Sequence, residues 1–188
     1  MHVTPSRRVD AIRTEDRILN NAPAVLRSDQ HASMGRIADE IGVHRATLYR
    51  HFPNREALIQ RLTERAIADG RAIVAAVPLD EPCLDEIRRL ATAIAEFGDR
   101  YRFLIGSSPV LAAGADPIGL TPLIERWQQA ALVRADLPPQ WFTLAFTALA
   151  IALQDTSTPS PDWLEGTNHA DVLFSTFVNG AAVDGRSR

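Results

Sequence analysis

The 188-residue sequence contains no lysine and one cysteine, Cys83. A single cysteine excludes an intrachain disulfide and any zinc site built from several thiolates, and it fits a reducing cytoplasm. The simplest interpretation of Cys83 is a small apolar filler, with a reactive thiol as the less favoured alternative. Because lysine is absent, arginine carries all of the positive side-chain charge, and codon bias alone would explain part of the arginine content.

Long hydrophobic runs are also missing. The longest, residues 141–153, has 13 residues, which is short of the roughly 20 that a membrane-spanning helix needs. The N-terminal MHVTPSRRVD has no apolar segment after its arginines and therefore does not look like a signal peptide. These features predict a soluble cytoplasmic protein with no membrane partner.

The net charge of −3 does not by itself indicate a nucleic-acid partner. Its distribution is uneven, however. Residues 1–60 carry nine arginines against seven acidic residues, a net charge of +2, whereas residues 61–188 carry eleven against sixteen, a net charge of −5. Four of the five histidines also lie in the first sixty residues. The N-terminal part is thus the basic side of the chain.

Strand patterns are scarce, and apolar residues recur instead at helical spacing, which predicts an all-α protein. The first helix should end near Arg27, and Pro23 should kink it or end it early. Thr121 followed by Pro122 is typical of a helix start, with the threonine hydroxyl as the cap. Further helices are expected over residues 34–41, 44–51, 55–77, 84–101, 141–153 and 168–182.

Residues 34–41 and 44–51 have the pattern of a helix-turn-helix. Ser33 is an expected N-cap, Ala38 is small enough for the second helix to cross the first, and Gly42 can adopt the positive φ of a tight turn. Ile37 and Leu48 belong to the apolar positions that would hold the pair on the first helix. The polar side chains of the second helix are left to face outward.

The run MGRIADEIGVHRATLYRHFPNREAL resembles the DNA-binding signature of the TetR/AcrR family of transcriptional regulators. The resemblance implies a homodimer whose N-terminal three-helix DNA-binding domain, residues 1–54, precedes a helical ligand-binding and dimerisation domain, residues 55–188. Residues 55–77 would form a connecting helix. The implied function is a ligand-responsive regulator, a repressor, that binds a palindromic operator in double-stranded DNA and is released by a small effector. One departure is the loop RSDQHAS, which lacks the glycine that members usually have.

Arg45 and Thr47, with His44 beside them, are the candidates for base-edge contacts, because the N-terminal residues of a recognition helix face the bases. An arginine can donate two hydrogen bonds to guanine, which is worth roughly 1–3 kcal/mol of discrimination. The alternative is an ordinary solvated face. A metal shared by His44 and His51 is a further alternative, but it lacks nearby carboxylates and thiolates.

Tyr49 and His51 are predicted to reach phosphates, since a phenol and an imidazole are suitable donors. Ser33 and Arg55 lie at helix N-termini, where backbone N–H groups also favour phosphate, although Ser33 could equally be a plain N-cap. Arg50 could contact either a base or a phosphate.

In the C-terminal part, the helix WFTLAFTALAIAL is apolar on every face and should be buried on every face. Together with the last helix, whose Phe174 and Phe177 form a second stripe, it is predicted to make a four-helix dimer interface through residues near 141–154 and 168–182. The alternative is a monomer with one deeply buried helix.

Aromatic residues at helical spacing could line an effector pocket, although a plain core is the more common outcome. Arg102 or Arg126 could face an anionic ligand or lie on the surface. No catalytic, metal-binding or cofactor-binding constellation is recognisable, so an all-helical enzyme is disfavoured, and a regulator acting through protein contacts alone stays open. The candidate pocket residues are Phe97, Tyr101, Phe103, Trp127, Phe142 and Phe146.

Overall fold

The computed structural model describes residues 5–78, 82–105, 116–154 and 166–181, and all of its regular structure in those ranges is helical, as predicted. The chain forms two compact units, Met1–Ala66 and Ile67–Arg188. The division falls inside α4 (Arg55–Ala75), after its first three turns. These turns belong with the N-terminal helices because they bury Leu58 and Leu62 completely. The expected domain boundary at residue 54 was placed from the sequence motif alone and stays a prediction.

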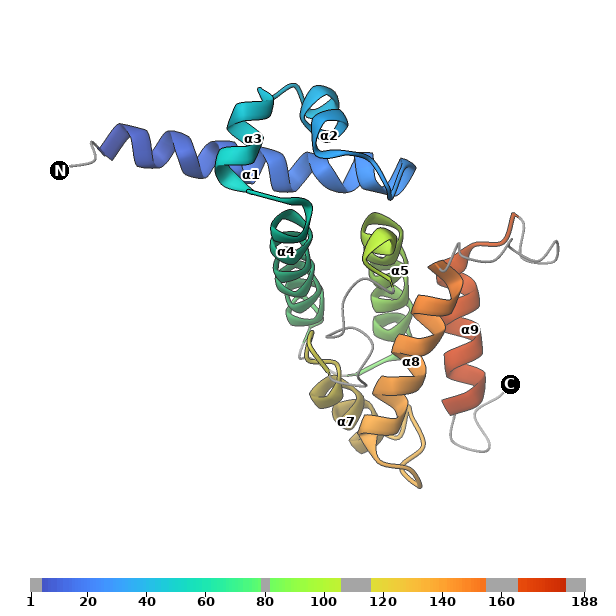
Figure 1. Ribbon diagram of the computed structural model, residues 1–188. Coiled ribbons are helices and arrows are strands. Elements are labelled where there is room, and N and C mark those ends of the chain that lie inside the picture. Colours follow the sequence, from blue (N-terminus) through green and yellow to red (C-terminus); the bar gives the residue numbers. More distant parts are fainter. Residues whose placement is uncertain (1–4, 79–81, 106–115, 155–165, 182–188) are drawn as a thin grey trace. The chain divides into compact units, whose positions relative to one another are not determined.

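The N-terminal unit contains α1 (Pro5–Ser28), α2 (Met34–Ile41), α3 (Arg45–His51) and the first part of α4. Figure 1 shows α2 and α3 on one side of α1. On α4, Arg61 forms an ion pair with Glu15 of α1 at 2.7 Å. All four helices contribute large aliphatic side chains that are completely buried: Ile18, Leu26, Ile37, Leu48, Leu58 and Leu62.

Of the two outcomes expected for Pro23, a kink or an early end of the first helix, the early end is wrong. Helix α1 continues through Pro23 to Ser28 and also begins far earlier than the apolar pattern indicates, at Pro5. A proline inside a helix costs about 3 kcal/mol. Complete or nearly complete burial of a large aliphatic side chain is worth about 1.5–3 kcal/mol. Ile18, Leu19 and Leu26 are all at most 4% exposed, so packing on both sides of Pro23 outweighs the proline.

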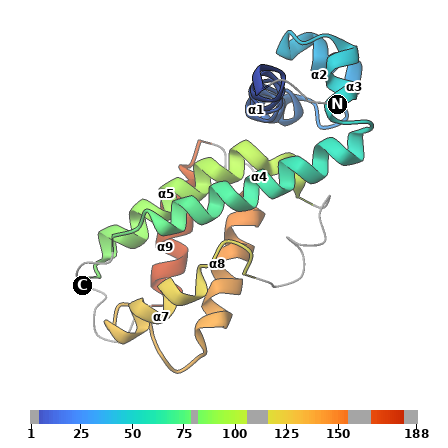
Figure 2. The same cartoon turned by 90° about the vertical axis from the view of Figure 1, so that its left-hand side faces the viewer.

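The C-terminal unit contains the end of α4, α5 (Leu84–Tyr101), the 3-10 turn η1 (Arg102–Leu104), α7 (Thr121–Gln129), α8 (Pro139–Gln154) and α9 (His169–Ala181). Helix α5 packs along α9 and α8, and α7 packs on α8 (Figure 2). Trp127 belongs to the core of this unit and is completely buried. Phe177 makes edge-to-face contacts with Phe142 and Phe146, with ring centroids 6.4 and 5.0 Å apart.

The start of α7 differs from the prediction. The residue at the cap position is Leu120, and the hydroxyl of Thr121 lies 3.0 Å from that of Thr143 instead of capping the helix. The cap is the carboxylate of Asp116, which accepts hydrogen bonds from the backbone N–H groups of Gly119, Leu120 and Thr121 at 2.7–2.9 Å. Burial by itself would raise the pKa of Asp116, but these hydrogen bonds together outweigh burial and hold the pKa below its usual value.

Replacing Asp116 by asparagine should lower the free energy of unfolding by about 1 kcal/mol at neutral pH, as expected for the loss of a helix cap. An amide has one acceptor oxygen, so the N–H of Thr121 would lose its partner. Because the pKa is lower in the folded chain, the contribution of Asp116 is complete above the unfolded value of about 3.9 and is lost as the pH falls through the folded value. Chemical denaturation should therefore give a constant difference between wild type and variant above about pH 5 that shrinks below about pH 4. A difference that does not change with pH would contradict a role for the carboxylate charge.

Helix α9 differs from the prediction at Phe177, whereas α8 buries one face and exposes another. Phe177 is 3% exposed and belongs to the chain's own core, so it does not offer a stripe to a second copy. Helix α8 buries Phe142 and Phe146 but leaves Trp141 and Leu144 49% and 52% exposed. In the single chain one face of α8 therefore remains uncovered, and burial of that face against a second copy, as the sequence predicts, stays a prediction. This exposed face, named the α8 stripe below, consists of Trp141, Leu144, Ala148 and Ala152.

No helix among the described residues is long and apolar enough to cross a membrane.

The C-terminal unit contains a buried ion pair. Arg126 of α7 donates from Nη2 to Glu86 of α5, whose side chain is 3% exposed, and Glu86 also accepts from the backbone N–H of Cys83 at 2.9 Å. Arg126 therefore pairs with a buried carboxylate of its own unit. This differs from both roles that the sequence left open, contact with an anionic ligand and a place on the surface.

Candidate nucleic-acid interface

The turn between α2 and α3 has the geometry that the sequence predicts. Gly42 adopts φ = 72°, and its N–H donates to the carbonyl groups of Ala38 and Asp39 at the end of α2. The N–H of Val43 also donates to Ala38, at 3.0 Å. Arg17 of α1 donates to the carbonyl groups of Ile41 and Gly42 at 3.0 and 3.2 Å. The C-terminal carbonyl groups of α2 are thus satisfied by backbone and by an arginine that the sequence did not single out.

The N-terminus of α2 and the loop before it are built by side chains. The hydroxyl of Ser33 accepts from the N–H of Arg36 at 3.2 Å, which makes it the predicted N-cap. Arg55 donates from Nη1 to the carbonyl of Ala32 at 2.7 Å and from Nη2 to the carbonyl of Gln30. Asp29 accepts from the N–H of His31 at 3.0 Å. The loop therefore closes without glycine and without a residue at positive φ, and in the free chain Arg55 is committed to it.

Helix α3 turns its apolar side inward and its donors outward. Leu48 is completely buried, whereas Tyr49 is 49% exposed. His44, Arg45 and Arg50 are also exposed, and Thr47 is half-buried. The backbone carbonyl of His44 accepts hydrogen bonds from the N–H groups of Thr47 and Leu48, and the His44 side chain makes no capping hydrogen bond. Five of the eight predicted DNA contacts thus lie together on one solvent-facing surface: His44, Arg45, Thr47, Tyr49 and Arg50.

His51 and Arg55 differ from that group. The Nε2 atom of His51 is buried and has no hydrogen-bond partner among the described residues. A phosphate contact by His51 through that nitrogen would require the ring to move. Arg55 would have to share the hydrogen bonds that it gives to the loop. Their roles at DNA stay predictions.

Arg45 has a partner that the sequence analysis missed. Its Nη2 lies 2.6 Å from Oδ2 of Asp39 and its Nε lies 3.4 Å from Oδ1. Donation by Arg45 holds the pKa of the Asp39 carboxyl below its usual range. An acid six residues before a basic residue, across a tight turn, is the only sequence signal for this pair.

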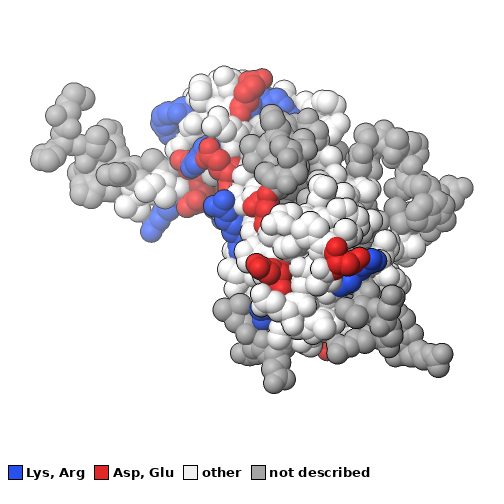
Figure 3. Space-filling model, turned by 90° about the horizontal axis from the view of Figure 1, so that it is seen from below, with Lys and Arg blue, Asp and Glu red and all other residues white. Residues whose placement is uncertain are grey.

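Charges of both signs are mixed on the face of the molecule that Figure 3 shows. On the face drawn in Figure 3, acidic and basic atoms alternate among uncharged ones, and the described part of that face carries no wide area of one sign. Among the described residues, no group of three or more histidine, cysteine or acidic residues is placed to hold a metal. The candidate interface is defined by the exposed and half-buried donors of α3 and its N-cap: His44, Arg45, Thr47, Tyr49 and Arg50.

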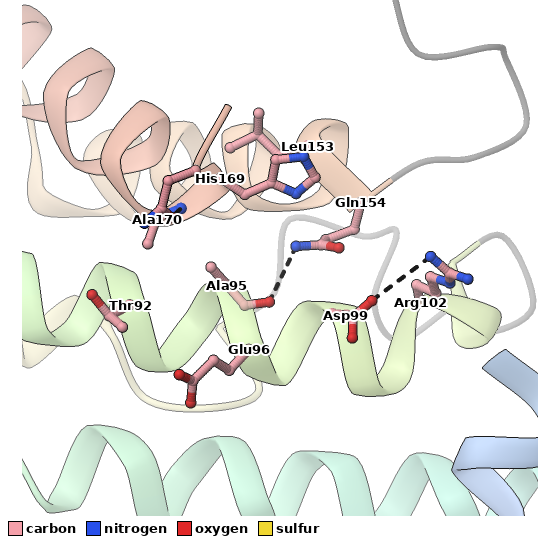
Figure 4. Close-up of a pocket in the computed structure, with 10 residues that line it drawn as sticks. Thr92, Ala95, Glu96, Asp99, Arg102, Leu153, Gln154, His169 and Ala170 are labelled. Carbon is pink, nitrogen blue, oxygen red and sulfur yellow. Dashed lines mark hydrogen bonds and ion pairs between the residues drawn. The ribbon is translucent and has the colours of Figure 1, made fainter. Parts of the chain in front are cut away.

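A pocket of about 440 Å³ lies in the C-terminal unit between α5, the end of α8 and the start of α9 (Figure 4). Polar and apolar groups both line it. Gln154 donates to the carbonyl of Ala95 at 3.1 Å, and Asp99 lies 3.7 Å from Arg102 in an ion pair. Glu96 and His169 also line the pocket.

None of the six predicted effector-contacting aromatics lines this pocket. Trp127, Phe142 and Phe146 belong to the core. Phe97, Tyr101 and Phe103 form a separate series of ring contacts, 5.1 and 6.3 Å between centroids, and the hydroxyl of Tyr101 donates to Asp69 of α4 at 2.6 Å. Their assignment to an effector site stays a prediction.

Comparison with known proteins agrees with this geometry. A family model described as bacterial regulatory proteins, tetR family, matches residues 30–62. The chain is 33% identical over 175 residues to the HTH-type transcriptional repressor LfrR of Mycolicibacterium smegmatis, covering 89% of this chain and 90% of that protein. The crystal structure of LfrR in complex with proflavine matches with a TM-score of 0.69 at 26% identity, over 91% of this chain and 97% of that one.

A TetR-family regulator from Haemophilus influenzae matches with a TM-score of 0.62 at 15% identity, over 93% of this chain and 98% of that one, which shows a likeness of fold. A helix-turn-helix in the N-terminal unit, followed by a separate helical unit, defines a DNA-binding transcriptional regulator. The chain belongs to the TetR family of bacterial regulatory proteins.

Proposed function

We propose that the protein is a homodimeric repressor that binds a palindromic operator through α3 and is released from it by a small effector. The observation that carries this proposal is the outward face of α3, where hydrogen-bond donors are exposed while Leu48 fills the core. As a regulator of this kind it would act in the cytoplasm, where the DNA is, and would not be an enzyme. The proposed DNA contacts are Ser33, His44, Arg45, Thr47, Tyr49, Arg50, His51 and Arg55.

The α8 stripe supports the homodimer. Trp141 and Leu144 are large apolar side chains that are about half exposed in the single chain, and the small residues Ala148 and Ala152 continue the same face. A two-fold dimer buries the same patch of both copies against each other. Such a dimer would present two α3 helices to half-sites about 34–36 Å apart on one side of the duplex.

The effector belongs to the C-terminal unit in this proposal. The relative LfrR has been crystallised with proflavine. Trp127 supports an interior site in this chain, because its Nε1 is buried and has no acceptor among the described residues, and a buried donor is usually paired. Helix α4 belongs to both compact units. An effector that prefers one arrangement of α4 would shift the population away from the DNA-binding form.

The experiment that tests the proposal is selection of duplexes bound by the purified protein, followed by titration of two variants on the selected sequence. Arg45→Ala should weaken binding to that sequence by roughly fivefold to 150-fold more than it weakens binding to other duplexes, since a base contact is worth about 1–3 kcal/mol. Tyr49→Phe should weaken binding to all duplexes alike, because a phosphate contact carries no sequence information. Affinity should also fall steeply with salt, with a slope of about −0.9 per phosphate neutralised. A protein that selects no duplex at low salt would instead be a regulator acting through protein contacts.

A further inference from the structure

The guanidinium of Arg45 is held by helix α2 through one of its edges. Nη2 lies 2.6 Å from Oδ2 of Asp39 and Nε lies 3.4 Å from Oδ1, so both carboxylate oxygens face the edge that carries Nε and Nη2. Contact through two parallel N–H···O lines fixes the orientation of the plane as well as its position. Arg45 and Asp39 are both exposed, so the pair lies on the surface that α2 and α3 share.

Gly35 forms the other boundary of this arrangement. A Cβ on Gly35 would lie 3.1 Å from Cζ of Arg45 and 3.3 Å from its Nε and Nη1. The guanidinium therefore lies close to the backbone of α2, and a methyl group at position 35 would push against it. Asp39 and Gly35 together, one at the edge and one beneath the plane, restrict where this arginine can point.

The edge that Asp39 occupies decides which donors remain. A guanidinium has five N–H donors in a fixed planar arrangement. With the Nε–Nη2 edge in contact with Asp39, the opposite edge still offers one N–H from Nη1 and one from Nη2, side by side. Two such donors match the O6 and N7 acceptors of guanine in the major groove.

We propose that Asp39 is a positioning residue for sequence recognition: it holds Arg45 by the Nε–Nη2 edge so that the Nη1–Nη2 edge meets a guanine of the operator. The inference rests on the proposed function and on Arg45 as a base contact. It gives Asp39 a role that its charge alone does not suggest, because an isolated carboxylate beside DNA only repels phosphate. The alternative is that Asp39 acts as a latch, an ion pair that keeps Arg45 away from DNA. The Nη1–Nη2 edge, which Asp39 does not contact, argues against this alternative.

The test compares Asp39→Asn with Glu40→Gln. Glu40 is the next residue of α2, is exposed, and pairs with Arg36 at 2.9 Å rather than with Arg45, so its variant removes the same charge without touching the proposed pair. Footprinting first identifies the operator guanine that wild type protects and Arg45→Ala does not. The measured quantity is the ratio of affinities for the selected operator and for a copy in which that guanine is replaced by adenine. Wild type should show a ratio between about fivefold and 150-fold.

Asp39→Asn should reduce that ratio about fivefold or more, toward the value of Arg45→Ala, whereas Glu40→Gln should leave it unchanged. Both variants should bind all duplexes somewhat more tightly, since each removes a negative charge. In an Arg45→Ala background, Asp39→Asn should have no further effect on the ratio, because Asp39 acts through Arg45.

Gly35→Ala provides a second variant whose effect cannot be mistaken for unfolding. Alanine is the better helix former, so the melting temperature should stay the same or rise, while the ratio should fall because the methyl group displaces the guanidinium. If Arg45→Ala abolishes the discrimination but Asp39→Asn and Gly35→Ala keep it, the positioning role is overturned and the proposed function stands. If Asp39→Asn strengthens operator binding with the ratio intact, the pair is a latch and the inference is wrong. If wild type prefers no duplex, the proposed function itself fails.

Discussion

Replacing Arg126 by methionine is expected to lower the free energy of unfolding by about 3–5 kcal/mol, the usual consequence of removing one partner of a buried ion pair. The side chain of Glu86 is 3% exposed and that of Arg126 is 19% exposed, so the carboxylate left behind would have little access to water. Methionine retains the approximate length of the arginine stem but supplies no donor. A domain is typically stable by only about 5–15 kcal/mol, so the loss should be evident as a large shift of the urea midpoint.

Two further variants isolate the cause. Arg134→Met removes one partner of the exposed pair with Asp136, whose side chains are 46% and 53% exposed, and should cost no more than about 1 kcal/mol. Glu86→Gln introduced into the Arg126→Met chain should recover part of the lost stability, because the uncompensated charge disappears while the amide oxygen can still accept from Cys83. Equal losses for Arg126→Met and Arg134→Met would show that the interior pair carries no special energetic weight.

The helix-turn-helix could be predicted from the sequence because its signals are local. The predicted bounds of α2 coincide with the observed ones, and they are set by Ser33 at one end and Gly42 at the other. Helix α5 also has the expected bounds, Leu84–Tyr101, since its apolar stripe continues without interruption. Where caps, turn residues and periodicity lie within a few residues of one another, one sequence contains enough information to place the element.

Errors arose where distant residues decide the outcome. The polar first turns of α1 have no apolar stripe that would reveal a helix beginning at Pro5. Pro23 is tolerated because of packing contributed by other helices. Thr121 has the composition of a cap, but Asp116 reaches the free N–H groups of α7 instead. For α8 and α9, an apolar residue such as Phe177 can face either its own core or a second copy, and periodicity does not distinguish the two.

The least predictable features were the partners of the arginines. Arg45 and Arg55 were both expected to contact DNA. The sequence contains only a weak signal that Arg45 contacts Asp39, and none that Arg55 closes the loop before α2. A long side chain reaches residues that lie more than twenty positions away, as Arg55 does. The choice of partner follows from the packed fold, so the candidate site could be located from the sequence while its internal contacts could not.

Leu144→Arg should convert the proposed homodimer into a monomer and abolish high-affinity binding to the proposed operator. Leu144 is 52% exposed in the single chain, so a charged side chain there is compatible with the folded monomer. In a two-fold dimer the same residue of both copies would be buried near the symmetry axis, and two unpaired arginines would have to lose their water. The mass in solution should fall from 2 × 20.7 = 41.4 kDa to 20.7 kDa. Without the second α3, affinity should drop on the order of 100-fold or more, the usual gain from linking two binding modules.

Gln129→Arg is the matched control, since it adds the same charge at an exposed position of α7 outside the α8 stripe. It should leave mass and operator affinity unchanged, and the melting curves of both variants should show a cooperative transition. A Leu144→Arg protein that remains a dimer with full operator affinity would place the interface elsewhere and leave the exposed Trp141 and Leu144 without an assigned partner. A monomer that still binds the full operator as tightly as wild type would separate dimerisation from DNA recognition, because one α3 would then be sufficient.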